Sequence, residues 1–101
     1  YLSKDTCRLF TTTVAKGCRR GLGFDKPDMQ NPAKSPCALS APASVYGHTG
    51  FTGTCAWVDP DNGLVYVFLS NRIYPEVWNA KLLKSDIRER IQEAMYRAVL
   101  K

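Results

Sequence analysis

The residue types most suited to chemistry lie together in residues 46–54. His48 is the only histidine of the 101 residues, and an imidazole can be neutral or cationic near neutral pH. Thr49 follows it and adds a hydroxyl that can donate or accept a hydrogen bond. The segment is therefore a candidate functional site.

A β-hairpin is expected to position this segment. Residues 48–58 and 63–71 are rich in Thr, Val, Tyr, Phe and Trp, and residues 59–63 separate them. Pro60 cannot continue a ladder, and Asn62 with Gly63 can supply the positive φ angles of a tight turn. Residues 64–69 are apolar without alternation, which predicts a strand that is covered on both faces. The hairpin is placed at residues 48–71.

Two segments precede the hairpin. Residues 1–24 are expected to hold a short helix over 3–15 and a short strand over 19–24, in which Gly21 and Gly23 favour close backbone approach or a bulge. Residues 25–47 contain four of the six prolines and no clear period, which predicts a long loop. A loop of this length more often borders a functional site or covers a partner surface.

The strongest helix pattern covers residues 85–100. Ser85 is a suitable N-cap, and Ile87, Ile91, Met95 and Val99 recur on one face. These residues should pack on the hairpin, so the predicted fold class is α+β, an antiparallel sheet of about three strands with a C-terminal helix on one face. Because only the short first helix remains for the other face, the chain should be a fragment or should assemble with another polypeptide.

Composition and spacing exclude several classes of protein. Fourteen basic and nine acidic side chains give a net charge of +5, but the charges are interleaved, which argues against a nucleic-acid partner. The longest apolar run, residues 64–69, is far too short to span a membrane. The four cysteines lack the Cys-x-x-Cys spacing of a zinc site, and no cofactor motif is present. Both disulfides and buried free thiols remain open for these cysteines.

The His48-Thr49-Gly50 triad at the start of the hairpin resembles the active-site strand of the serine β-lactamase and penicillin-binding-protein superfamily. That family usually has Lys-Thr-Gly there, and class C-like esterases and hydrolases have His-Thr-Gly. Residues 21–24 look like the strand that precedes the motif, residues 57–60 and 64–72 look like the rest of the hairpin, and the last helix lies where the family has its C-terminal helix. The chain is most similar to the β-lactamase-like module at the C-terminus of some family-three glycoside hydrolases.

The resemblance implies roles for named residues. His48 would be an electrostatic or proton-relay group, Thr49 would bind the substrate, and Phe51 would offer its N–H to the oxyanion, so that residues 48–51 form the catalytic strand. Gly50 and Gly53 would keep the strand surface low for the substrate. The substrate would also contact Thr52, Asn71 and Arg72. Of these, Asn71 and Arg72 would lie near the edge of the cleft and could bind an anionic group of the substrate.

The parent of such a fragment would hydrolyse an ester, amide or lactam through an acyl-serine, without a metal or other cofactor. None of the serines here is followed three positions later by lysine, so the family's Ser-x-x-Lys nucleophile motif is absent and this chain alone should be inactive. Its partners would be the rest of the parent chain, or further copies through exposed apolar surface, together with a small acyl substrate. The alternative is a noncatalytic interaction module of a larger secreted carbohydrate-active protein, with the Pro-rich loop as its contact surface. By resemblance, the location would be periplasmic or secreted in a bacterium.

Overall fold

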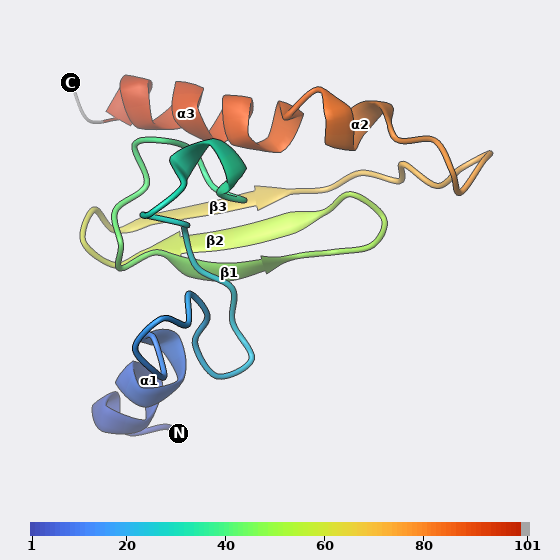
Figure 1. The fold of residues 1–101 in the computed structure, drawn as a ribbon. Coiled ribbons are helices and arrows are strands. Elements are labelled where there is room, and N and C mark those ends of the chain that lie inside the picture. The colour runs from blue at the N-terminus through green and yellow to red at the C-terminus, as the bar shows by residue number, and fades with distance from the viewer. Residues whose placement is uncertain (100–101) are drawn as a thin grey trace.

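The computed structural model describes residues 1–99 (Figure 1). Its elements in chain order are α1 (Lys4–Thr11), the 3-10 turn η1 (Pro32–Lys34), β1 (Tyr46–Thr49), β2 (Cys55–Asp59), β3 (Leu64–Phe68), α2 (Lys81–Lys84) and α3 (Ile87–Val99). Leu100, the last residue of the predicted helix, and Lys101 lie outside the described residues. Among the helices of residues 1–99, none has both the length and the apolar character needed to cross a membrane.

The three strands form one antiparallel sheet in the order β1-β2-β3. Gly47, Trp57 and Tyr66 lie opposite one another across it and share a face. Figure 1 shows α3 running along this face, and Trp57 and Tyr66 are buried beneath it. The predicted fold class, a three-stranded antiparallel sheet with a C-terminal helix packed on it, is confirmed.

The identity of the third strand differs from the prediction. A turn at residues 50–54 divides the run 48–58, so that β1 and β2 both come from it, and β1 begins at Tyr46 within the predicted loop. The strand predicted over residues 19–24 is wrong, because the Gly21 N–H donates to the Phe24 carbonyl and Gly23 has φ +77°, which bends the chain. Only Asp25 forms a bridge, to Gly47. Gly21 does make the expected close approach, since a Cβ there would lie 2.7 Å from the Phe10 carbonyl oxygen.

The middle of the Pro-rich loop is part of the core. Its Cys37, Ala38, Ala41 and Val45 are all buried, with exposed fractions of 4% or less. The Ala38 N–H donates to the Gln92 side-chain oxygen at 2.8 Å, so the loop is fastened to α3. Buried backbone groups need such partners. The loop therefore fills space beside α3 that a regular element would otherwise occupy.

The helix α3 begins and faces the sheet differently from the prediction. Ser85 is the C-cap of α2 rather than the N-cap of α3, because its N–H donates to the Lys81 carbonyl. Asp86, at φ +52°, separates the two helices. The buried side chains of α3 are Gln92 and Tyr96. The partly buried Ile91 and Met95 pack against the core as expected, whereas the predicted contact of Val99 is wrong, since that side chain is exposed.

The first helix is shorter than predicted and buries no residue. Ser3 caps it by accepting the Thr6 N–H, as the sequence suggested. It ends at Thr11 rather than Ala15 because Thr12 adopts an extended conformation and its hydroxyl bonds back to the Arg8 carbonyl. Such back-bonding by threonine weakens a helix end.

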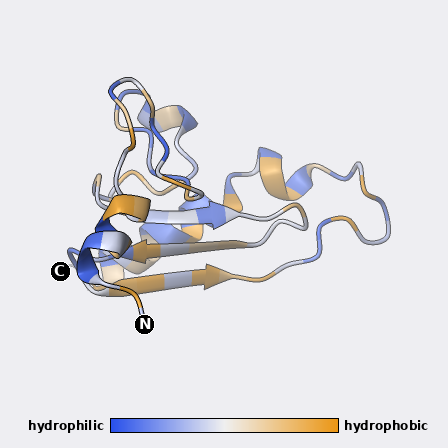
Figure 2. Cartoon of the chain, turned by 90° about the horizontal axis from the view of Figure 1, so that it is seen from below, coloured by the Kyte–Doolittle hydropathy of each residue, from blue (hydrophilic) through white to orange (hydrophobic). Residues whose placement is uncertain are grey.

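The face of the sheet opposite α3 remains open. Val65, Val67 and Leu69 are exposed by 62%, 56% and 78%. Figure 2 looks at this face and shows the hydrophobic colour of β2 and β3. Within residues 1–99 the apolar strand is therefore covered on one face only, which agrees with the expectation that this chain lacks one layer. Strand β3 lies at an edge of the sheet.

One buried carboxylate joins the hairpin turn to α3. Asp59 is 2% exposed and accepts the Tyr96 hydroxyl at 2.7 Å. It also accepts the N–H groups of Asp61 and Asn62 and the Asn62 side-chain amide. Burial alone would raise the pKa of Asp59, but the hydrogen bonds from Asn62 and Tyr96 outweigh it and lower the pKa below its usual value. The carboxylate is thus ionised and fully partnered.

Replacing Tyr96 by Phe should cost about 1.5 to 3 kcal/mol of unfolding free energy, because it removes a hydrogen bond to a buried charge. Tyr66→Phe is the matched control, since it removes a hydroxyl that donates to the neutral Arg88 carbonyl at 3.0 Å, and it should cost only about 0.5 to 1.5 kcal/mol. Urea unfolding followed by circular dichroism measures both. A Tyr96→Phe cost no larger than that of Tyr66→Phe would contradict the role given to Asp59.

The pH dependence of stability should report the same carboxylate. Because the pKa of Asp59 is lower in the folded chain, its stabilisation is present above the unfolded value near 3.9 and is lost as pH falls through the folded pKa. Asp59→Asn should therefore be less stable than wild type at pH 7, and the difference should shrink toward pH 2 to 3. Urea unfolding at several pH values measures it, and a difference that is constant from pH 7 to pH 2 would rule out this linkage.

Candidate functional site

The first two residues of the His-Thr-Gly segment lie on β1, an edge strand held close to β2, and Gly50 begins the turn that follows. A Cβ at Gly47 would lie 1.9 Å from the Ala56 carbonyl oxygen, so only glycine permits this approach. His48 is exposed and Thr49 is partly buried at the end of the strand. The strand therefore presents His48 at the surface while its backbone is fixed by pairing with β2.

The turn after β1 has its own glycine requirements. The Gly50 N–H donates to the Thr54 carbonyl at 2.8 Å, and the Gly53 N–H donates to the Gly50 carbonyl at 3.0 Å. A Cβ at Gly50 would lie 2.2 Å from the Thr54 hydroxyl oxygen, and Gly53 has φ +93°. The tight turn thus requires glycine at both positions. This requirement explains Gly50 and Gly53 more directly than the expected need for a low strand surface along which a substrate could lie.

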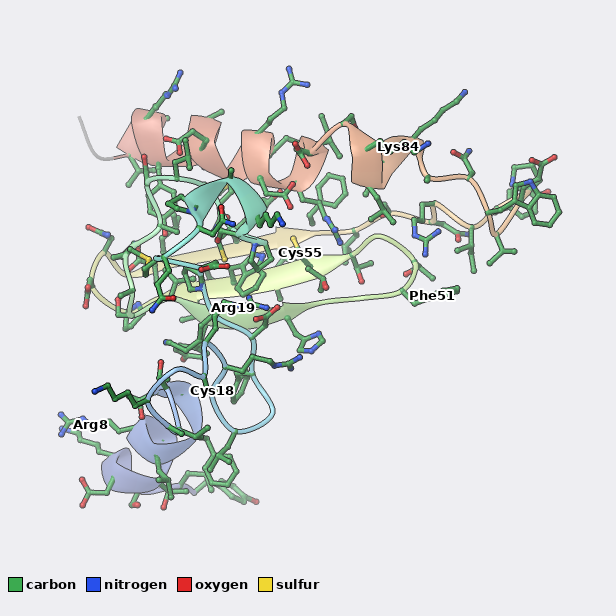
Figure 3. All side chains as sticks on the ribbon, in the orientation of Figure 1. Arg8, Cys18, Arg19, Phe51, Cys55 and Lys84 are labelled. Atoms are coloured by element: carbon green, nitrogen blue, oxygen red, sulfur yellow. The ribbon has the colours of Figure 1, made fainter. Side chains whose placement is uncertain are left out.

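Phe51 follows the triad at the tip of this turn (Figure 3). Its side chain is 66% exposed, and the Arg72 guanidinium carbon lies 4.8 Å from the centre of its ring. Within residues 1–99 the Phe51 N–H donates to no other group. An unused N–H in a fixed turn is the kind of donor that an oxyanion requires.

The turn also meets the segment that follows β3. The Thr52 carbonyl accepts the Arg72 N–H at 2.9 Å and the Ser70 hydroxyl at 3.0 Å. The guanidinium of Arg72 donates to the Val77 carbonyl at 3.1 Å. Asn71 is exposed, beside Arg72 in the chain. The structure therefore brings Thr52 and residues 70–72 together, as the hairpin prediction required, although Arg72 is partly engaged by its own loop.

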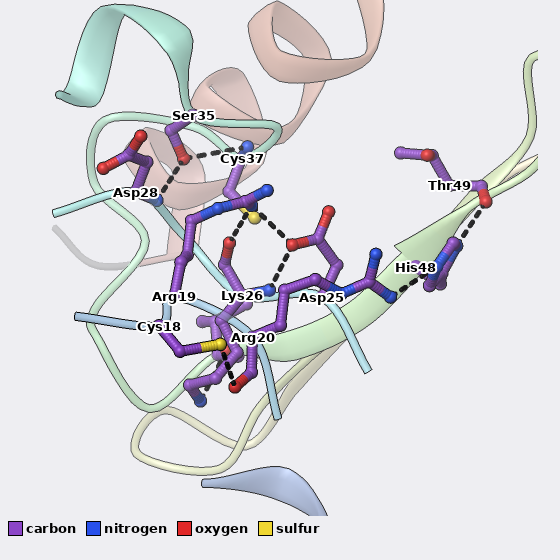
Figure 4. Close-up of polar contacts among 11 residues, drawn as sticks. Cys18, Arg19, Arg20, Asp25, Lys26, Asp28, Ser35, Cys37, His48 and Thr49 are labelled. Atoms are coloured by element: carbon purple, nitrogen blue, oxygen red, sulfur yellow. Dashed lines mark hydrogen bonds and ion pairs between the residues drawn. The ribbon is translucent and has the colours of Figure 1, made fainter. Parts of the chain in front are cut away.

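Arg20 contacts His48 across 28 positions of sequence. Its guanidinium lies 2.9 Å from Nε2 of His48, and Nδ1 of the same ring lies 2.6 Å from the Thr49 carbonyl oxygen (Figure 4). The neighbouring Arg19 pairs instead with Asp25 and with the Lys26 carbonyl. In the sequence, Arg19 and Arg20 are simply two adjacent basic residues. No local pattern predicts that Arg19 pairs with Asp25 while Arg20 contacts His48.

The buried thiols near the sheet are not suited to act as nucleophiles. Burial raises the pKa values of the Cys37 and Cys55 thiols, so both stay protonated. All four cysteines are free thiols. Lys26 is buried with its ammonium on the carbonyls of Thr11 and Val45, and burial lowers its pKa. Residues 1–99 hold no cluster of metal-binding side chains.

Comparisons with known proteins extend these observations. The sequence pattern of the Beta-lactamase family matches residues 4–85. A protein of Escherichia coli O157:H7 described as "Putative D-alanyl-D-alanine carboxypeptidase" is 35% identical over 75 residues, which are 74% of this chain and 17% of that protein. Proteins with the same description from Escherichia coli strain K12 and Salmonella gallinarum are each 34% identical, over 73 and 77 residues. No solved structure matches the chain.

The chain thus spans 17% of the length of the first of these relatives. The family match, by contrast, includes β1, the turn with Phe51, the other two strands and α2. On this match over most of its length, the chain belongs to the Beta-lactamase family.

Proposed function

We propose that this chain forms the oxyanion and substrate-aligning wall of a serine hydrolase of the β-lactamase and penicillin-binding-protein type. The observation that carries the proposal is the Phe51 N–H, which is unused within residues 1–99 and lies at the exposed tip of the turn after His48-Thr49-Gly50. Such a donor stabilises the tetrahedral intermediate of acyl transfer. Thr49 would align the substrate, and residues 52, 71 and 72 would border it.

The nucleophile would come from a longer polypeptide that includes this segment. The 101 residues contain no Ser-x-x-Lys, so acyl-serine formation requires a serine outside them. The reaction would be hydrolysis of an ester, amide or lactam, with no metal or other cofactor. Because the relatives are described as D-alanyl-D-alanine carboxypeptidases, a peptide ending in D-alanyl-D-alanine is one substrate to test.

Within the family we propose the class C-like branch, because His48 stands where other branches have lysine. Within that branch, the proposed likeness is to the β-lactamase-like modules at the C-terminus of some family-three glycoside hydrolases. A noncatalytic module that binds a partner through residues 25–47 is less well supported, because the middle of that loop is buried in the chain's own core.

The open face of the sheet should be covered by the rest of the same polypeptide. Val65, Val67 and Leu69 form an exposed apolar stripe on β3 and just beyond it, and β3 has no strand on its outer edge within residues 1–99. The relatives are several times longer than the matched segment, which is 17% of the first of them. Additional chain of that length could supply both a strand and a covering layer.

The oxyanion role predicts different effects of two substitutions at one position in the longer polypeptide. Phe51→Pro removes the N–H and should lower kcat by about 10²- to 10³-fold. Phe51→Ala keeps the N–H and removes only the ring, so kcat should stay within about tenfold of wild type. Steady-state hydrolysis of a nitrophenyl ester, with thermal unfolding to confirm that both variants fold, gives the comparison.

Equal kcat values for folded Phe51→Pro and Phe51→Ala would remove Phe51 from the oxyanion site.

For the isolated 101 residues we expect no covalent adduct with a labelled penicillin by intact mass. Stoichiometric acylation of one of their own serines would overturn the proposal that the nucleophile lies elsewhere.

The exposed stripe predicts that the isolated chain binds a dye specific for apolar surface. Val65→Thr combined with Val67→Thr keeps the β-branched shape and should lower dye fluorescence. The matched control is Leu9→Thr with Val14→Thr, which changes two exposed apolar residues on or near α1. Fluorescence titration and sedimentation measure the effect. If the chain instead forms a stable dimer, and Val65→Thr combined with Val67→Thr abolishes that dimer, the stripe is the contact surface between two copies of the chain.

A further inference from the structure

We propose that Arg20 carries the positive charge beside the His-Thr-Gly strand and holds His48 as a neutral imidazole protonated at Nδ1. The assignment of charge deepens the proposed function and rests on it, whereas the state of His48 follows from the contacts alone. Sequence resemblance assigns an electrostatic role to His48 itself, so the two readings differ on which side chain is charged.

The contacts of the ring determine where its proton is. Nδ1 lies 2.6 Å from the Thr49 carbonyl oxygen, which can only accept, so Nδ1 must carry a hydrogen. Nε2 lies 2.9 Å from the Arg20 guanidinium, which can only donate, so Nε2 must present its lone pair. An imidazolium would place an N–H against the N–H of arginine. In this arrangement His48 is therefore neutral and in one tautomer.

The surroundings of Arg20 leave its charge available. The carboxylate nearest in sequence, Asp25, pairs with Arg19, which also donates to the Lys26 carbonyl. Of the ion pairs within residues 1–99, none includes Arg20. Its side chain is exposed, and its contact with His48 uses one of five guanidinium N–H donors. Arg20 can thus hold the imidazole and still meet an anionic group of a substrate.

Arg20 acts on His48 as a positioning residue. By occupying the Nε2 lone pair, it prevents His48 from taking a proton there as long as the contact persists. It also fixes the plane of the ring from the side opposite to the Thr49 carbonyl. The lysine that other family members have at position 48 would thus be replaced by a pair, an arginine that supplies charge and a histidine that orients it.

The tautomer can be measured in the 101-residue chain, where His48 gives the only imidazole signals. Long-range proton–nitrogen correlation spectra above pH 8 should show Nδ1 protonated and Nε2 unprotonated in wild type. Arg20→Ala should shift the population toward the Nε2–H tautomer, and Arg20→Lys, which keeps a donor, should restore Nδ1–H. Lys16→Ala removes an equal charge from a nearby exposed position and should change nothing.

Wild type with Nε2–H as the main tautomer, or an unchanged ratio in a folded Arg20→Ala chain, would overturn the proposal. Backbone amide spectra confirm that each variant is folded. This measurement needs no activity, so it stands or fails independently of the proposed hydrolase function.

The charge role is tested in the longer polypeptide with a nitrophenyl ester that bears a free carboxylate and with its uncharged methyl ester. Arg20→Ala should raise KM for the anionic ester by about tenfold or more, while KM for the neutral ester stays within about twofold. Arg20→Lys should recover part of the loss. Equal KM changes for both esters would reject the charge role, whereas absence of hydrolysis by wild type would instead reject the proposed function.

Discussion

The arrangement of this chain depends on a buried carboxylate at the end of the central strand. Asp59 fixes the β2–β3 turn through the N–H groups of the residues that follow it, and it fixes α3 through the Tyr96 hydroxyl. A buried charge without partners would cost several kcal/mol. The same ion therefore requires the turn and the helix to form together. With α3 in place, Trp57 and Tyr66 are covered and the sheet has one dry face.

The Pro-rich loop completes that face by a different means. It has little regular structure, so its backbone groups take partners from α3, as Ala38 does from Gln92 and Ser40 from Glu93. The hydrogen bonds from Ser40 also lower the pKa of Glu93. A helix that offers buried polar side chains can thus hold an irregular segment in the core. This explains why the buried positions of α3 include a glutamine rather than only the apolar residues of its periodic stripe.

Features encoded by local pattern could be predicted from the sequence, and features that depend on distant partners could not. The residues of β2 and β3 and the last helix follow from strand composition and helical period. The predicted strand at 19–24 failed because Gly23 turns the chain there, and Ser85 caps the preceding helix because α2 ends at Lys84. The motif at 48–50 is visible in sequence, but the contact of Arg20 with His48 spans a loop whose path no local signal gives.

The two faces of the sheet differ in what they require of the rest of a protein. The α3 face is closed by the chain itself, whereas Val65 and Val67 face outward on the other side. The His48 strand lies at the opposite edge of the sheet from β3, so a layer added over the open face could approach both the apolar stripe and the candidate site. A nucleophile carried by that layer would then be positioned by the same burial that covers the stripe. In this arrangement, covering the apolar face and assembling the proposed acyl-transfer site would be one event, because β1, which leads into the turn with the proposed oxyanion donor, is already fixed by its pairing with β2.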